Sequence, residues 1–297
     1  MITKFFKRIL RRDPMVKHTQ ANQTGAPKRI PKKSHRIDPH LLSKNAVKVT
    51  QTLQQAGYEA FIVGGAVRDL VLGIEPKDFD VATNATPDQV QRLFRKARLI
   101  GRRFQIVHVT FFGKGHPEII EVSTFRALLD NAGDHVAESG RILRDNVWGS
   151  QGEDAARRDF TINAMYYDPS TETVLDYHGG MADMQRKTLR MIGDPAKRYR
   201  EDPVRMLRAI RFAAKTGFSL DQNTRLPIAK LGKLLQDVPA ARLFDEILKL
   251  LMSGYSWAAI QGLQEVGLHH GLLPLLDHIL DDSENAIGAN EIGRAHV

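Results

Sequence analysis

The sequence predicts an α+β fold: a small mixed β-sheet with flanking helices, followed by all-helical modules. Two observations predict it. Between residues 60 and 124, short β-rich runs alternate with helix-start signals, whereas the chain beyond Asp159 is mostly helical apart from a small hairpin near 165–175. The 297 residues suffice for one large domain or two smaller ones, each with a buried core.

The composition narrows the class of protein. The chain has no cysteine, which excludes disulfides, thiolate metal sites and cysteine nucleophiles. No apolar run approaches the roughly 18 residues that span a bilayer. Hydrophobic residues make up 42% of the chain and charged residues 26%, as is ordinary for a globular protein. A reducing compartment suits this composition, and we expect a cytoplasmic location.

The surplus positive charge lies in residues 1–36, which contain 11 Lys or Arg and one acid. Residues 1–12 place apolar side chains at helical spacing among basic ones, a pattern typical of a basic amphipathic helix. Such a helix could make weak contact with an anionic membrane surface or with RNA phosphate. Residues 13–36 are polar and predict a disordered basic linker. A solvated tail without specific function remains the alternative.

The globular part begins near residue 38 with recognisable elements. Gly57 ends a first helix, and Thr86-Pro87 begins another one. A glycine-rich connection at 113–117 joins two β-rich runs into a hairpin. The predicted elements are helix 41–56, strand 60–63, strand 79–82, a helix from 87 to 94, strands 106–112 and 118–124, and a flexible loop over 126–153.

A glycine pair and two aspartates form the first candidate site. Gly64 and Gly65 open a short helix, where backbone N–H groups can approach a triphosphate. Asp78 and Asp80 follow on an apolar strand, and residues two apart point to the same side. They can therefore hold divalent cations jointly, and two such ions stabilise an in-line displacement. A DFD alone is usually a solvated turn, but the upstream glycines favour the functional interpretation.

Further charged residues occur in apolar surroundings. Glu121 interrupts an apolar strand, where a carboxylate is costly unless it is paired or binds a metal; a solvent-facing edge position is equally compatible. Arg157, Arg158 and Asp159 precede an apolar segment that we expect to be helical. Arg158 could bind triphosphate oxygens, whereas Asp159 could be an N-cap only.

A helix start is expected at Asp202, as N-cap, with Pro203 at the first helical position. Arg205, Arg208 and Arg211 then fan across one face at intervals of three. A charged face is normally solvated. Without intervening acids, however, three arginines repel one another, which favours an anionic ligand between them.

These motifs, in this order, resemble those of the class II nucleotidyltransferases, which comprise bacterial poly(A) polymerases and CCA-adding tRNA nucleotidyltransferases. The resemblance runs from about Ala60 to Pro274. It rests on GGAVRD at 64–69, DFD at 78–80, RRDFTINA at 157–164, EDPVRMLRAIRF at 201–212 and ARLFDE at 241–246.

The resemblance implies transfer of AMP from ATP to RNA 3′ ends with release of pyrophosphate. Asp78 and Asp80 would bind Mg²⁺, and Asp159 or Glu121 would complete the catalytic carboxylates. Asp202 and Arg205 would read the edge of the base. The remaining contacts, to the triphosphate or the rest of the nucleotide, would come from Gly64, Gly65, Arg68, Arg158, Arg208 and Arg211.

The branch of the family is indicated by LIGRRFQIVHV at 99–109, which is similar to the signature of bacterial poly(A) polymerases. The basic N-terminal segment and the lack of an HD-type phosphohydrolase dyad agree. A CCA-adding enzyme is the alternative, as is an inert RNA-binding protein of the same fold.

The resemblance also implies an arrangement of domains: a basic disordered extension (1–36), a catalytic head (37–190) and a helical neck with a truncated body (191–290). Residues 291–297 resemble a translated sequencing adapter, so we expect them to be non-native and the gene to be truncated.

Overall fold

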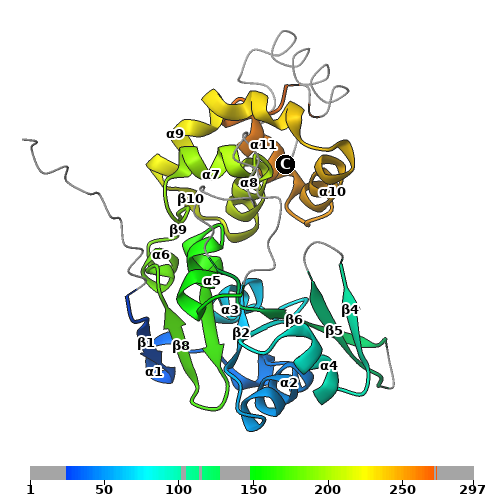
Figure 1. Cartoon of the computed structure of the whole chain (residues 1–297). Coiled ribbons are helices and arrows are strands. Elements are labelled where there is room, and N and C mark those ends of the chain that lie inside the picture. The colour runs from blue at the N-terminus through cyan, green and yellow to red at the C-terminus, as the bar shows by residue number, and fades with distance from the viewer. Residues whose placement is uncertain (1–24, 102–104, 114–115, 128–147, 271, 273–297) are drawn as a thin grey trace, which may run out of the picture.

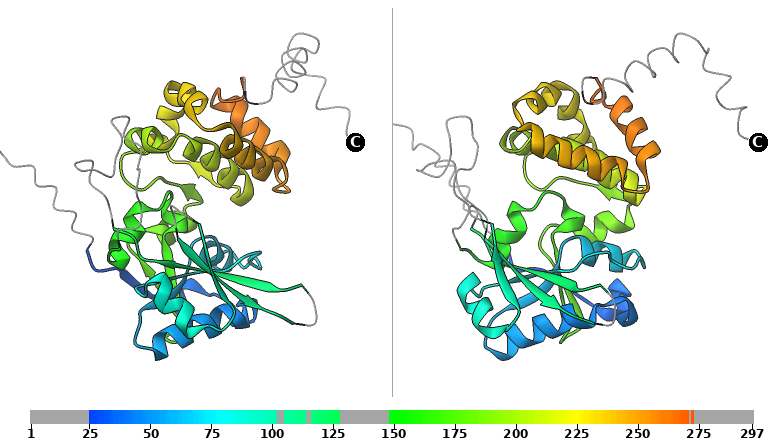
Figure 2. Two further views of the ribbon diagram at one scale, coloured as in Figure 1. Left: turned by 45° about the vertical axis from the view of Figure 1, so that its right-hand side comes forward. Right: turned by 90° about the vertical axis from the view of Figure 1, so that its right-hand side faces the viewer.

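The computed structural model describes residues 25–101, 105–113, 116–127, 148–270 and 272 (Figure 1). A mixed β-sheet with its flanking helices forms one lobe, and helices α7 to α11 gather in a second lobe above it in Figure 1. The two further views show the same separation (Figure 2). The predicted α+β class is therefore confirmed.

The main sheet has eight strands in the order β1-β8-β7-β2-β3-β6-β5-β4. Neighbouring strands run antiparallel except for β3 and β6, which run parallel. Two further short strands, β9 and β10, pair in parallel. The strands are β1 Lys28–Pro31, β2 Ala60–Val63, β3 Asp80–Thr83, β4 Ala97–Ile100, β5 Ile106–Phe111, β6 Glu118–Thr124, β7 Met165–Asp168, β8 Thr173–Asp176, β9 Thr188–Leu189 and β10 Ser219–Leu220.

The α-helices of the sheet lobe are α1 Lys32–His35, α2 Lys44–Gln55, α3 Gly65–Val71, α4 Pro87–Leu93, α5 Gln151–Arg157 and α6 Gly180–Gln185. Those of the helical lobe are α7 Pro195–Glu201, α8 Val204–Thr216, α9 Gln222–Leu231, α10 Ala240–Leu251 and α11 Ser256–Glu265. Three short 3-10 helices complete the list: η2 Pro39–Leu41, η3 Thr161–Asn163 and η4 Gly232–Asp237. None of the described helices is both long and apolar enough to cross a bilayer.

Alternating side chains of the strands build two cores. Ile62 and Val81 point toward the large core, which contains Leu53 of α2 and extends into the helical lobe. Val63 points to the opposite face and packs in a smaller core with Ala155 of α5. This period of two is what a sheet covered on both faces requires.

Most predicted elements are confirmed with small shifts at their ends. Helix α4 has the expected start, with Thr86 and Gln89 forming a capping box. The predicted hairpins are β5–β6 and β7–β8. The predicted loop over 126–153 is wrong at its C-terminal end, because Ser150 and Glu153 form a capping box that starts α5 at Gln151.

The predicted disorder of residues 13–36 is wrong for residues 28–36. Strand β1 pairs with β8 at the edge of the sheet. The buried His35 is held by the carbonyl of Glu172 and by the N–H of Ile37, each within 3.0 Å. Pairing with a distant strand is a tertiary interaction, so a polar composition could not reveal it.

Several predictions fall outside the described residues. They are the amphipathic helix at 1–12, positions 102–104 of the branch signature, most of the 126–153 loop and the segment 291–297.

Candidate active site

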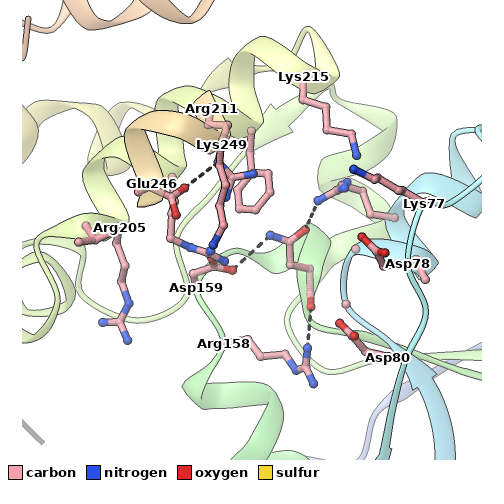
Figure 3. Close-up of a pocket in the computed structure, with 18 of the residues that line it drawn as sticks. Lys77, Asp78, Asp80, Arg158, Asp159, Arg205, Arg211, Lys215, Glu246 and Lys249 are labelled. Atoms are coloured by element: carbon pink, nitrogen blue, oxygen red, sulfur yellow. Dashed lines mark hydrogen bonds and ion pairs between the residues drawn. The ribbon is translucent and has the colours of Figure 1, made fainter. Parts of the chain in front are cut away.

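A cavity of about 840 Å³ is lined by residues of both lobes. Figure 3 shows carboxylates from the sheet lobe facing cationic side chains of α8 and α10. All twelve residues predicted for the site line this cavity: Gly64, Gly65, Arg68, Asp78, Asp80, Glu121, Arg158, Asp159, Asp202, Arg205, Arg208 and Arg211. The structure thus brings together motifs that are more than a hundred residues apart.

The glycine turn lies close to charged side chains. Gly64 directly precedes α3 and has a φ of 72°. This positive φ favours glycine. A Cβ atom there would lie 3.3 Å from Nη1 of Arg158 and 3.8 Å from Oδ2 of Asp80. The turn therefore leaves open a narrow space between a guanidinium and a carboxylate.

The two aspartates lie at the beginning of β3. The strand starts at Asp80, so Asp78 lies two residues before it rather than on it as predicted. Neither carboxylate has a hydrogen bond or an ion pair with another described residue. Burial raises the pKa of Asp80 to about 6, and the negative charges of Glu121 and Asp78 add to this effect, against the opposing charge of Arg158.

Glu121 is the carboxylate beside this pair. It stands opposite Asp80 in the register of the parallel strands β3 and β6. Its Oε1 lies 3.3 Å from Nε2 of His108, and half of its side chain is exposed. Within the described ranges, no three acidic or histidine side chains are close enough to form a complete metal site. Since the charges of Asp78 and Glu121 raise the pKa of Asp80, a cation at this position fits the donor set.

Arg158 is fixed on the other side of the glycine turn. It follows α5 directly, and the expected helix after it is only the 3-10 turn η3. Its guanidinium donates to Oδ2 of Asp154 and to the hydroxyl of Tyr166, both at 3.2 Å. Tyr166 also donates to Asp154 at 2.6 Å. The guanidinium is therefore held in one orientation beside Asp80.

Asp159 is not a helix N-cap, because Phe160 takes that position at the start of η3, and its carboxylate pairs with α8 instead. Its Oδ2 accepts two hydrogen bonds from Arg208, at 2.6 and 2.9 Å, and its Oδ1 accepts from Asn163 and the N–H of Phe160. Burial raises the pKa of Asp159, but the charge of Arg208 and these hydrogen bonds outweigh it, and the pKa lies below the ordinary value. Asp159 is therefore ionised and fully paired.

Each arginine on α8 has an acidic partner, which offsets the predicted repulsion, although burial and, to a smaller extent, the charge of Arg208 still lower the pKa of Arg211. Arg205 lies 3.1 Å from Glu201, Arg208 pairs with Asp159, and Arg211 lies 2.7 Å from Glu246 of α10. Two of these acids come from distant parts of the chain, so the local sequence did not show them.

Asp202 does not cap α8 with its side chain, in contrast to the prediction. The helix begins at Val204, with Pro203 as its N-cap residue. Oδ2 of Asp202 accepts from Arg242 at 2.7 Å, whereas the buried Oδ1 has no donor among the described residues. Asp202 lines the cavity, so this buried acceptor without a partner among the described residues lies beside the cavity wall.

Eleven further residues line the cavity although the sequence interpretation did not assign them to the site, among them Lys77, Asn163, Lys215 and Lys249. Figure 3 shows Lys77 and Lys215 on the side of the pocket that holds Asp78. Sequence position could have indicated two of these residues, Lys77 and Lys215. Lys77 directly precedes Asp78, and Lys215 follows Arg208 by two helical turns on the same face.

The comparisons with known proteins agree with this geometry. A family profile described as "Poly A polymerase head domain" matches residues 60–190, and one described as "Probable RNA and SrmB- binding site of polymerase A" matches residues 217–280. Poly(A) polymerase I of Salmonella typhimurium is 48% identical over 98% of this chain and 62% of its own length. The chain belongs to the poly(A) polymerase family.

More distant members of this nucleotidyltransferase family add CCA. The CCA-adding enzyme of Bacillus pumilus is 39% identical over 80% of this chain and 57% of its own length. Among solved structures, the Bacillus stearothermophilus CCA-adding enzyme in complex with CTP superimposes with a TM-score of 0.67 at 35% identity, over 80% of this chain and 54% of that one. The chain spans about three fifths of the length of the poly(A) polymerase it matches.

Proposed function

We propose that the protein adds AMP from ATP to RNA 3′-hydroxyl groups without a template and releases pyrophosphate. The higher identity to poly(A) polymerase I, 48% against 39% for the CCA-adding enzyme, supports polyadenylation over CCA addition. The observation that carries the proposal is the pair of unpartnered carboxylates, Asp78 and Asp80, opposite the basic wall formed by α8. Such a pocket fits a nucleoside triphosphate with its metal ions.

In this proposal, the phosphate end of the nucleotide lies at the glycine turn. Backbone N–H groups after Gly64 and the fixed guanidinium of Arg158 bind triphosphate oxygens. The donors of Arg68 are already engaged by Asp69 and Asn163, so Arg68 supports this end from behind the turn. Asp78 and Asp80 would hold Mg²⁺, with Glu121 as third carboxylate, and the ions supply charge stabilisation for the displacement.

The base end of the nucleotide lies at the start of α8. The free Oδ1 of Asp202 accepts from the 6-amino group of adenine, and Arg205 donates to a ring nitrogen. A polar site of this kind rejects a base that leaves its buried groups unpaired. Arg208 and Arg211 hold the remainder of the nucleotide.

The chemical step joins two substrates held by these groups. The 3′-hydroxyl oxygen of RNA loses its proton to water and forms a bond to the α-phosphorus, while the bond from that phosphorus to the bridging oxygen breaks and pyrophosphate leaves. The residues matched by the RNA-binding profile, 217–280, supply the RNA-binding part of the neck. We further propose the predicted division into a head over 37–190 and a neck from 191, and a cytoplasmic location.

The proposal is tested by incubating the protein with each nucleotide separately, on an unstructured RNA and on a tRNA that lacks CCA. We expect runs of adenosine on the unstructured RNA and little use of CTP on either substrate. Addition of C, C and A followed by arrest on the tRNA would move the protein to the CCA-adding branch. No incorporation of any nucleotide would contradict the transferase proposal.

A further inference from the structure

A buried chain of hydrogen bonds connects the two ends of the candidate nucleotide pocket. It begins on α8, where Nζ of Lys215 lies 2.9 Å from Oδ2 of Asp69 on α3. The other oxygen of Asp69 accepts from Arg68, the residue before it in α3. This helix begins at the glycine turn. Asp69 and Arg68 are only 4% and 3% exposed, so water does not compete for these bonds.

The chain continues through the amide of Asn163 in η3. Nη1 of Arg68 donates to Oδ1 of Asn163 at 2.8 Å, and Nδ2 of Asn163 donates to Oδ1 of Asp159 at 3.2 Å. Asp159 in turn accepts from Arg208, which returns the chain to α8. Lys215 and Arg208 are two helical turns apart, so the bonds close a ring that fixes α8 against the glycine turn.

The chemistry of this ring requires a side chain at position 163 that both donates and accepts, as the amide of Asn163 does. Arginine can only donate hydrogen bonds and an ionised aspartate can only accept them, so the residue between Arg68 and Asp159 must do both. The low pKa of Asp159 keeps it ionised at neutral pH. An aspartate at position 163 would accept from Arg68 but would face Asp159 with a second negative charge. A leucine of similar size would remove the hydrogen bonds of Arg68 and Asp159 to residue 163.

We propose that Asn163 is a positioning residue for nucleotide selection, which sets the place of the base-reading helix α8 relative to the triphosphate end of the pocket. This inference rests on the proposed function, because it assigns the base to α8 and the phosphates to the glycine turn. Asn163 acts through Arg68 and Asp159 and needs no contact with the base. Changing it alters base preference rather than the chemical step.

The test compares Asn163→Asp with wild-type protein by equilibrium binding of ATP, CTP and inorganic tripolyphosphate. We expect Asn163→Asp to weaken ATP binding about tenfold, the equivalent of about 1.4 kcal/mol, and to reduce the preference for ATP over CTP. Binding of tripolyphosphate, which probes the phosphate end alone, should change less than about twofold. The corresponding steady-state result is a raised KM for ATP with little change in kcat.

A matched control lies in the same 3-10 turn. The hydroxyl of Thr161 donates to Asp183 at 2.8 Å, outside the ring. Thr161→Val therefore removes a buried hydrogen bond of η3 and should lower stability while it leaves base preference unchanged. Equal loss of base preference in Thr161→Val and Asn163→Asp would overturn the proposal, because the effect would then be a general loosening of η3.

Exchanging the two side chains provides the rescue. In the double variant Asp159→Asn with Asn163→Asp, residue 163 accepts from Arg68 and from the new amide, and residue 159 still accepts from Arg208. The proposal predicts that this double variant binds ATP more tightly, and with more preference over CTP, than Asp159→Asn alone. That comparison tests the role of Asn163 even if Asn163→Asp alone does not fold. An exchange that restores nothing contradicts the proposal.

The binding measurements also separate this inference from the proposed function. If the wild-type protein binds ATP in preference to CTP but adds no AMP to RNA, the transferase proposal fails while the role of Asn163 is still tested. If AMP addition is normal and Asn163→Asp keeps wild-type base preference, only the inference fails.

Discussion

The two ends of the pocket differ in how the protein compensates their charges. At the sheet end, Asp78 and Asp80 have no partner among the described residues, and burial together with the nearby Glu121 raises the pKa of Asp80 to about 6. At the helical end, Arg208 and Arg211 are both ion-paired within 2.7 Å. At the sheet end the charge of Arg158 does not offset burial and the neighbouring carboxylates, so a further cation fits there, whereas the arginines of the helical end are paired before a ligand arrives.

This difference separates binding of the reacting groups from recognition of the base. A cluster of unpaired carboxylates is unfavourable in the folded protein until a cation neutralises it. Ion pairs around α8 instead hold long side chains in place, which reduces the ordering that a nucleotide would otherwise impose. Substitutions at the two ends should accordingly have opposite consequences for stability and different consequences for activity.

The largest expected effect is on catalysis at the sheet end. Asp78→Asn or Asp80→Asn should lower AMP addition by about three orders of magnitude or more, because each removes a ligand of the proposed metal site. Single-turnover transfer from ATP to an RNA oligonucleotide measures it. Asp88→Asn, in the exposed first turn of α4, is the control and should be fully active. Near-normal turnover in either site variant would refute the two-metal assignment.

A smaller effect is expected at the base end. Arg205→Ala should reduce the preference for ATP over CTP by about tenfold to a hundredfold, since a hydrogen bond to a charged group contributes about 1.5–3 kcal/mol. Binding of tripolyphosphate should change little. The control is Arg225→Ala on α9, whose guanidinium donates to the carbonyl of Glu265. If preference for ATP is unchanged, base reading belongs to other groups.

The sequence predicted the members of the site better than it predicted their partners. Order and spacing singled out twelve residues for the site, and all twelve line one cavity. What the sequence could not show is that Arg208 pairs with Asp159, 49 residues away, or that Asp69 pairs with Lys215, 146 residues away. Repulsion among the α8 arginines was inferred from local neighbours alone, and tertiary ion pairs with Asp159 and Glu246 offset it in part.

The same limit applies to the N-terminal segment. Residues 28–36 are polar and basic, yet a sheet edge and the buried His35 order them. A deletion meant to remove only the N-terminal basic charge should therefore end before β1.

A third charged region, residues 1–24, should affect affinity alone. Deleting residues 1–24 removes six basic side chains and one acid. We expect unchanged single-turnover AMP addition and a shallower salt dependence of RNA binding, by about 0.7 in slope for each lost phosphate contact. Binding to anionic vesicles, measured in parallel, tests the proposed membrane contact. If the salt slope and vesicle binding both stay the same, the segment contributes no electrostatic affinity.

The contrast between the two ends also sets the pH dependence of stability. A carboxyl group with a raised pKa favours folding in its protonated form, so the Asp80 contribution is fully present below about pH 4 and is lost as pH rises to about 6. The lowered pKa of Asp159 gives the opposite sign: its contribution is present above the ordinary value of 3.8 and is lost as the pH falls through the lowered pKa. Above pH 6 both carboxylates are ionised.

The most direct measurement is therefore the unfolding of wild-type protein, Asp80→Asn and Asp159→Asn at pH 7, with and without Mg²⁺. Without metal, Asp80→Asn should be more stable than wild type by about 1–3 kcal/mol, and Asp159→Asn less stable by about 1–3 kcal/mol. Mg²⁺ should stabilise wild type and Asp159→Asn but not Asp80→Asn. Destabilisation of both variants to a similar extent, or equal stabilisation of all three proteins by Mg²⁺, would contradict the account.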